Sequence, residues 1–147
     1  MNKVSTLIID DSDVDRYLLK RDLDKTDFKL TVFEREDGEE ALEFFIEYEK
    51  NKSLYPDDYP PMVVFLDINM PRMNGYEFLE EFSRLREKVD PNLMDLKSSV
   101  FIIYSSSDRE EDKKRMLSYD CVKSYLVKGQ FTSADLSKEI MPLVASS

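Results

Sequence analysis

The most informative stretch of this 147-residue sequence is Val63-Val64-Phe65-Leu66-Asp67-Ile68-Asn69-Met70-Pro71. Its four leading apolar residues run without interruption into a single carboxylate, which is typical of a strand buried on both faces of a sheet. Pro71 and Gly75 stop the strand and turn the chain toward a helix. Asp67 is therefore predicted to lie at the carboxyl end of a buried strand, where a crevice can open.

Strand and helix patterns alternate five times along the chain, with no internal repeat and no linker. This alternation predicts an α/β fold with a parallel sheet covered on both faces and right-handed crossovers. The common five-stranded doubly wound order, 2-1-3-4-5, places the Asp67 strand in the centre. Strands are predicted at residues 4–9, 29–33, 62–66, 100–104 and 125–127, and helices at 14–23 and 41–50 and from about residues 75, 107 and 133.

The first helix is predicted to begin after Ser12 or Asp13, either of which can cap it. Val14, Tyr17 and Leu18 then lie on one side of this helix.

Two later segments also give local predictions. The segment 51–61 contains three prolines and two aspartates, and it is predicted to be a loop. Ser107 and Glu110, three residues apart, match a capping box at the start of the fourth helix.

Composition excludes several classes of site and partner. The formal net charge of −10 opposes sequence-independent binding to nucleic acid or anionic membranes, and no apolar run is long enough to span a bilayer. The chain contains no histidine, so imidazole catalysis and histidine metal ligation are excluded. Three glycines cannot assemble a phosphate loop or a dinucleotide fingerprint. A single cysteine favours a reducing, cytoplasmic setting.

Polar residues follow four of the predicted strands at the point where each strand ends. In a parallel sheet these ends share one edge, and ligands bind outside it. We therefore expect one small volume to be faced by Asp10, Asp11, Asp67, Ser105 and Lys128.

Three carboxylates that lie close together repel one another, and a hard divalent cation relieves this repulsion. An oxygen-only ligand set with room for water suits Mg²⁺. Asp11 and Asp67 are predicted to bind the ion directly and Asp10 through water, with the backbone carbonyl of Asn69 completing the set. An aspartate in such a site can act as a nucleophile and form an acyl phosphate, whose oxygens Lys128 and the metal would stabilise.

Four motifs together resemble the receiver domain of two-component response regulators, over about residues 3–143. They are Ile8-Ile9-Asp10-Asp11, Leu66-Asp67-Ile68-Asn69-Met70-Pro71-Arg72-Met73-Asn74-Gly75, Ile102-Ile103-Tyr104-Ser105 and Tyr125-Leu126-Val127-Lys128. The resemblance implies the flavodoxin-like (βα)5 fold, with Asp67 as the phosphoacceptor. By the same resemblance, Ser105 is the switch hydroxyl, Tyr125 the switch aromatic and Lys128 the phosphate-binding lysine.

The resemblance also implies partners. Such domains take phosphate from a histidine kinase or a histidine phosphotransfer protein and signal to a downstream protein. They do so through the face built from the fourth helix, fifth strand and fifth helix, which is also the usual homodimer surface. Residues 1–147 are expected to form a single receiver domain with no output domain, which catalyses only its own phosphorylation and dephosphorylation.

Two features depart from the usual receiver pattern. Gly129 follows the lysine where the family usually has proline, often after a cis bond. A cis bond before a residue other than proline costs about 2.5–4 kcal/mol, so this loop is expected to be trans or reshaped. The connector from about Lys88 to Ser98 is longer than in most receivers, and it either lengthens the third helix or forms a docking surface.

Two other functions remain open at this point. A Mg²⁺-dependent phosphatase would also use an aspartyl phosphate, but such enzymes typically need a second aspartate two residues after the nucleophile, where this chain has Asn69. A phosphorylation-independent docking module would have lost the ability to accept a phosphoryl group. The intact set of site residues argues against this alternative.

Overall fold

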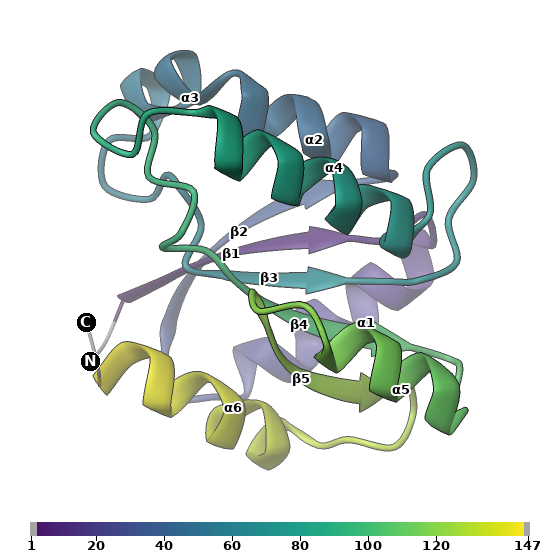
Figure 1. The fold of residues 1–147 in the computed structure, drawn as a ribbon. Helices are drawn as coiled ribbons and strands as arrows, with labels where there is room; N and C mark the ends of the chain where they lie inside the picture. Colours follow the sequence, from purple (N-terminus) through teal and green to yellow (C-terminus); the bar gives the residue numbers. More distant parts are fainter. Residues whose placement is uncertain (1–2, 146–147) are drawn as a thin grey trace.

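The computed structural model describes residues 3–145, which form five strands and six helices in alternation (Figure 1). The strands are β1 (Lys3–Ile9), β2 (Lys29–Arg35), β3 (Val63–Leu66), β4 (Val100–Ser105) and β5 (Val122–Val127). The helices are α1 (Asp13–Asp24), α2 (Gly38–Ile46), α3 (Tyr48–Leu54), α4 (Gly75–Lys88), α5 (Glu110–Leu117) and α6 (Ser133–Ala145).

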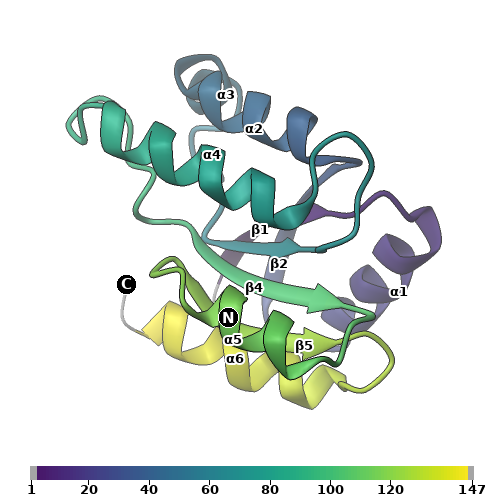
Figure 2. The same ribbon diagram turned by 45° about the vertical axis from the view of Figure 1, so that its right-hand side comes forward.

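The strands form one parallel sheet in the order β2-β1-β3-β4-β5. β3 is central, and all four of its residues are completely buried between β1 and β4. Figures 1 and 2 show the strands pointing the same way, so that their carboxyl ends share one edge. The predicted fold class, the strand order and the central place of the Asp67 strand are therefore confirmed.

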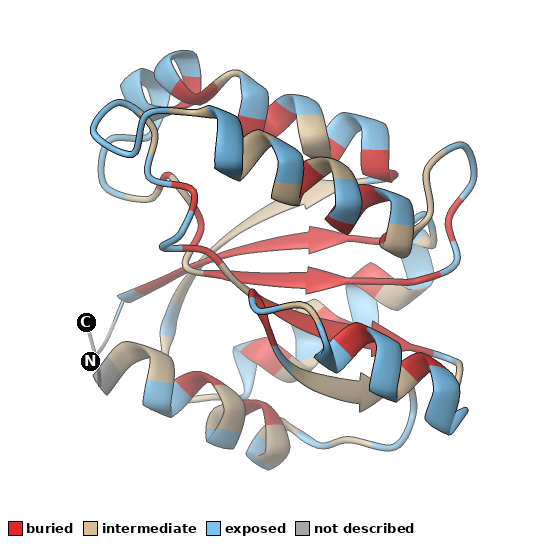
Figure 3. Cartoon of the chain, viewed as in Figure 1, coloured by how far each residue is buried: buried red, intermediate tan, exposed pale blue. Residues whose placement is uncertain are grey.

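Helices cover both faces of the sheet, and each face has its own apolar core. α1 and α6 pack on one face, where Leu19 and Leu136 join the buried side chains of the strands. α2, α4 and α5 pack on the other, around a group of aromatic rings that includes Phe45, Phe82 and Phe101. The buried positions follow the inner strands and the inward helix faces (Figure 3). Among residues 3–145, none of the helices has the length and apolar character that crossing a membrane requires.

The predicted apolar side of α1 faces solvent. Ser12 caps this helix as predicted, its side chain accepting from the Asp15 N–H. However, Val14 and Tyr17 are 66% and 63% exposed. The residues of α1 that pack on the sheet are instead Leu19 and Leu23. Leu19 and Leu23 share a face of the helix because they are four residues apart. Arg16 lies on the same face, and because it is charged, a search for apolar residues alone does not identify this face as buried.

A short helix occupies part of the segment that was predicted to be a loop. The helix predicted at 41–50 is divided into α2 and α3, and α3 extends to Leu54. Asn51 in α3 donates from its side-chain amide to the carbonyl of Phe44 at 2.8 Å, and the hydroxyl of Tyr59 donates to the same carbonyl at 2.7 Å. These contacts satisfy a buried carbonyl near the end of α2, so the loop prediction holds only for residues 55–61.

The predicted capping box of the fourth helix is wrong. α5 begins at Glu110, after Arg109, and has no side-chain cap. The Ser107 hydroxyl instead donates to Asp112 at 2.5 Å. A capping box needs the serine to be the residue immediately before the helix, and here it lies three residues before Glu110.

Two departures from the usual receiver pattern take definite forms. α4 ends at Lys88, so the connector does not lengthen that helix, and its Leu96 is buried in the core. The Lys128–Gly129 peptide bond is trans, as expected, and Gly129 has φ +79°. That conformation favours glycine and is closed to proline, whose φ is fixed near −65°.

Candidate functional site

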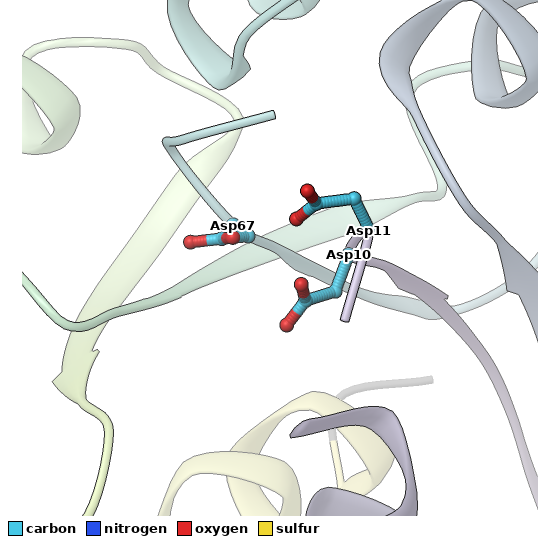
Figure 4. Close-up of side chains that lie close together, drawn as sticks. All are labelled: Asp10, Asp11 and Asp67. Atoms are coloured by element: carbon cyan, nitrogen blue, oxygen red, sulfur yellow. The ribbon is translucent and has the colours of Figure 1, made fainter. Parts of the chain in front are cut away.

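The three predicted acidic residues lie together at the carboxyl edge of the sheet. Asp10 and Asp11 follow β1, and Asp67 follows the neighbouring strand β3. One carboxylate oxygen from each lies within 4.8 Å of the others (Figure 4). Asp10 and Asp67 are buried, whereas Asp11 is exposed. This is a compact, oxygen-only cluster that is open to solvent on one side.

Asp10 accepts three hydrogen bonds from the protein on its two carboxylate oxygens. Its Oδ1 accepts from the Ser12 N–H at 2.9 Å, and its Oδ2 accepts from the Tyr104 hydroxyl at 2.6 Å and from Lys128 Nζ at 2.8 Å. The Arg16 guanidinium also donates to the Asp10 backbone carbonyl, at 2.5 Å. Asp10 is therefore fixed in place and offers little free capacity for a direct metal bond.

Asp67 combines deep burial with one engaged and one available oxygen. Its Oδ1 accepts from the Ile68 N–H at 2.8 Å, while Oδ2 lies 3.4 Å from Lys128 Nζ. Burial, followed by the charge of Asp10, raises the pKa of Asp67 to about 7, and Lys128 partly offsets the rise. In the metal-free site the protonated form of Asp67 is thus more populated near neutral pH than for an ordinary aspartate, and a bound cation would favour the carboxylate.

Gly75, at the start of α4, allows the helix backbone to approach the backbone of Asp67 closely. A Cβ at this position would lie 2.6 Å from the Asp67 backbone carbonyl oxygen, which no side chain tolerates. The Gly75 N–H donates to the Ile68 carbonyl at 2.8 Å. The small residue therefore closes the β3–α4 loop tightly around the acid cluster.

Lys128 reaches the cluster from the end of β5. Its Nζ donates to Asp10 at 2.8 Å and to Asp15 at 2.9 Å, and its side chain is 18% exposed. Burial disfavours the charge, but the hydrogen bonds to the two carboxylates outweigh it and raise the pKa of Lys128. The amine is therefore a permanent cation beside Asp67.

Ser105 and Tyr125 lie on the β4–β5 side of the site. The Ser105 hydroxyl oxygen accepts from the Ser107 N–H at 3.1 Å, and Ser105 is buried at the end of the strand next to β3. The half-buried Tyr125 donates from its hydroxyl to the Ser107 carbonyl at 2.8 Å. Both predicted switch residues thus contact the same loop residue.

An aspartate in α5 ties this loop to two helices. Asp112 accepts from the Ser107 hydroxyl at 2.5 Å, from the Tyr76 hydroxyl of α4 at 2.6 Å and from Arg109 Nε at 3.2 Å. The hydrogen bonds from Ser107 and Tyr76 hold the pKa of Asp112 at about 2. The loop after β4 is therefore joined to both α4 and α5 through one carboxylate.

The sequence reading missed three residues that contact the site: Asp15, Arg16 and Tyr104. Tyr104 carried a signal, because it is the polar-tipped residue of an otherwise apolar strand and directly precedes Ser105. Asp15 and Arg16 carried none, since charged residues in the first turns of a helix are ordinarily solvated. The backbone carbonyl of Asn69 stays a predicted ligand; Asn69 is exposed on the β3–α4 loop.

Solved structures with similar folds are signalling proteins. A two-component response regulator from Cytophaga hutchinsonii is 24% identical with a TM-score of 0.73, and the alignment covers 98% of this chain and 99% of that one. The receiver domain of the histidine kinase CKI1 from Arabidopsis thaliana, solved with Mg²⁺, is 23% identical with a TM-score of 0.69, covering 93% and 91%. At these identities the likeness shows the fold.

Curated relatives match over shorter regions. The chemotaxis protein CheY of Thermotoga maritima is 36% identical over 86 residues, which are 58% of this chain and 58% of that protein. The matches span between 20% and 58% of the length of the relatives. The family model described as response regulator receiver domain matches residues 6–141, nearly the whole chain. With the strand order 2-1-3-4-5 and the acid cluster beside Lys128, this match shows that the chain belongs to the response regulator receiver domain family.

Proposed function

We propose that this receiver domain accepts a phosphoryl group on Asp67 and that Asp67 Oδ2 is the accepting oxygen. The observation that carries the proposal is the convergence of a partly buried cation and two further carboxylates on that side chain. Lys128 Nζ lies 3.4 Å from Oδ2, and Oδ1 is held by the Ile68 N–H. The accepting oxygen is therefore oriented, and a cation stands beside the place where phosphoryl charge would develop.

The acid cluster fits Mg²⁺. Its donors are all carboxylate oxygens, burial and then the charge of Asp10 raise the pKa of Asp67 to about 7, and the cluster is open to water on the Asp11 side. Asp11 and Asp67 would hold the ion directly and Asp10 through water, because Asp10 already accepts three hydrogen bonds. The Asn69 carbonyl is the fourth proposed protein ligand. When bound, the ion neutralises the carboxylates and the phosphoryl oxygens.

The chemical step is an in-line displacement at phosphorus. Asp67 Oδ2 forms the new oxygen–phosphorus bond while the bond between phosphorus and the donor atom breaks. The electron pair of that bond leaves with the donor, a phosphohistidine nitrogen or the oxygen of a small acyl phosphate. Lys128 donates a hydrogen bond to a transferred oxygen, so the added negative charge is met by a cation that the burial of the site keeps close.

The phosphorylated state is proposed to switch the loop after β4. The Ser105 hydroxyl turns to a phosphoryl oxygen, and Tyr125 follows through its contact with the Ser107 carbonyl. The outcome is a changed surface on α5, β5 and α6, the elements that correspond to the fourth helix, fifth strand and fifth helix of the sequence prediction. We propose that this face contacts the downstream protein and serves any homodimer.

The proposed upstream partner is a histidine kinase or a histidine phosphotransfer protein, because these are the partners of the receiver domain family to which the chain belongs. Its net charge of −10 argues against nucleic acid and anionic membranes as partners. A phosphatase acting on external esters is not favoured, because position 69 offers an amide where a general acid is needed. Catalysis is proposed to be limited to the domain's own phosphorylation and dephosphorylation.

The test is labelling with acetyl phosphate. Wild-type protein and Asp67→Asn are incubated with acetyl phosphate, with Mg²⁺ or with EDTA, and analysed by intact mass spectrometry. We expect one phosphoryl group on wild type with Mg²⁺ and none on Asp67→Asn or with EDTA. Asp24→Asn, an exposed carboxylate on α1, is the matched control and should label like wild type. Labelling of Asp67→Asn would refute the assignment, as would turnover of phosphate esters without a labelled protein.

A further inference from the structure

Two side chains outside the proposed phosphoryl-transfer set hold the ammonium of Lys128. Asp15, in the first turn of α1, accepts from Nζ at 2.9 Å, and the ring centre of Tyr104 in β4 lies 4.9 Å from Nζ. Asp10 supplies the other close contact at 2.8 Å. The ammonium therefore lies among groups from β1, α1 and β4, and only one of these three belongs to the acid cluster.

Asp15 competes with Asp67 for this ammonium. A lysine ammonium has three N–H donors. Two are directed to Asp10 and Asp15, and Asp67 Oδ2 is the most distant of the three carboxylates, at 3.4 Å. A donor engaged by Asp15 cannot serve a phosphoryl oxygen on Asp67. Asp15 thus occupies one of the three donors that could otherwise serve such an oxygen.

Tyr104 fixes both Asp10 and the ammonium. It is 1% exposed, and its hydroxyl donates to Asp10 Oδ2 at 2.6 Å, the same oxygen that Lys128 contacts. Its ring packs edge-on against Phe65, which is completely buried. Asp10 is completely buried too, so water does not replace a lost hydroxyl without rearrangement. The position of Lys128 therefore depends on a hydroxyl in the core.

Resting on the proposed function, we propose that Tyr104 and Asp15 are positioning residues that set the reach of Lys128 with opposite effects. Tyr104 holds Asp10 and, through it, the ammonium beside Asp67, which favours phosphoryl transfer. Asp15 draws the ammonium away from Asp67, which slows transfer. Neither side chain contacts Asp67 directly; both act through Lys128.

The first experiment separates Asp15 from a general charge effect. Asp15→Asn and Asp13→Asn remove the same charge from the same turn of α1, but Asp13 pairs with Arg16 and not with Lys128. Initial labelling rates are measured with saturating acetyl phosphate and Mg²⁺, and Mg²⁺ affinity by calorimetry. We expect Asp15→Asn to label about two- to fivefold faster than Asp13→Asn, the range that loss of a partly exposed ion pair gives. Mg²⁺ affinity should differ less than twofold between them.

The second experiment separates the Tyr104 hydroxyl from its ring. Tyr104→Phe keeps the packing against Phe65, and Tyr104→Leu removes the ring as well. We expect labelling to slow by about tenfold or more in Tyr104→Phe, as loss of one hydrogen bond to a carboxylate predicts. Its urea midpoint should also fall, because the buried Asp10 carboxylate loses a donor, so labelling rates are compared under conditions where the variant stays folded. Tyr104→Leu should slow labelling further because the ring beneath the ammonium is lost. A purely structural role would lower the midpoint and leave the rate at 25 °C unchanged.

The outcomes distinguish this inference from the proposed function. If wild type takes no label, the proposed function fails and the inference falls with it. If wild type is labelled, the inference alone is overturned by either of two results: Asp15→Asn labelling no faster than Asp13→Asn, or Tyr104→Phe labelling at the wild-type rate.

Discussion

Replacing Asp67 by asparagine should stabilise the metal-free protein at high pH. The pKa of Asp67 is raised from 3.8 to about 7 because the carboxyl is buried next to Asp10. The folded chain thus binds this proton more tightly than the unfolded chain. Stability from this group is full at pH values below 4 and falls as the pH rises toward and through 7. Asparagine stays neutral and can still accept from the Ile68 N–H, so it avoids the loss.

The size of the effect follows from the shift. A tenfold change in proton affinity is worth about 1.4 kcal/mol, so ionised Asp67 costs the fold up to about 4 kcal/mol at pH 8. Between pH 5 and pH 8 the cost grows by about 2–3 kcal/mol. For a chain of this length that corresponds to a change of about 5–10 °C in melting temperature.

The assay is urea unfolding followed by circular dichroism in EDTA at pH 5 and pH 8. We expect Asp67→Asn to exceed wild type by more at pH 8 than at pH 5, with Asp24→Asn as the control for removal of one negative charge. With saturating Mg²⁺ the difference should shrink or reverse, because the ion binds only the chain that keeps the carboxylate. If the free energies of unfolding of wild type and Asp67→Asn depended equally on pH, Asp67 would not be the carboxyl group whose pKa is raised in this site.

Further outcomes can be measured on the same protein. Millimolar Mg²⁺ should raise the melting temperature, because the acid cluster exists only in the folded chain. The rise should be smaller at pH 6 than at pH 8, because at pH 6 a proton competes with the ion for the Asp67 carboxylate. An unchanged melting temperature would contradict the metal site. Gly75→Ala should lower the free energy of unfolding by about 1–3 kcal/mol or more, since its Cβ would lie 2.6 Å from a backbone oxygen. Gly129→Ala, in open space with φ +79°, should cost only about 1–2 kcal/mol and serves as its comparison in urea titrations. Asp112→Ala should lower the free energy of unfolding by about 1–3 kcal/mol, because three donors lose their acceptor. This difference from wild type should disappear as the pH falls from about 4 to 2, because the pKa of Asp112 is lowered to about 2 in the folded chain.

The sheet and the acid cluster could be predicted because they depend on patterns local to each strand. Apolar runs such as Val63–Leu66 identify buried parallel strands, and the residue after each run must lie at the shared carboxyl edge. Topology then brings Asp10, Asp11 and Asp67 within 4.8 Å. No packing detail was needed for that step.

The supporting contacts could not be predicted because they depend on side-chain directions. Asp15 reaches Lys128 across 113 residues of sequence, and Tyr104 reaches Asp10 across 94. Likewise, Ser107 has the spacing of a cap but donates to Asp112, since α5 begins three residues later. The solvent-facing side of α1 was misassigned because a charged residue occupies its buried face.

The carboxylate of Asp112 has one further implication for how the molecule reports its state. Ser107 contacts both Ser105 and Tyr125, and its hydroxyl shares that carboxylate with Tyr76 of α4. A displacement of Ser107 would therefore either move Asp112 and Tyr76 with it or break the hydrogen bonds that join them. If the proposed switch of this loop occurs, Asp112 would extend its effect from α5, β5 and α6 to α4, although Asp112 lies outside the proposed phosphoryl-transfer set.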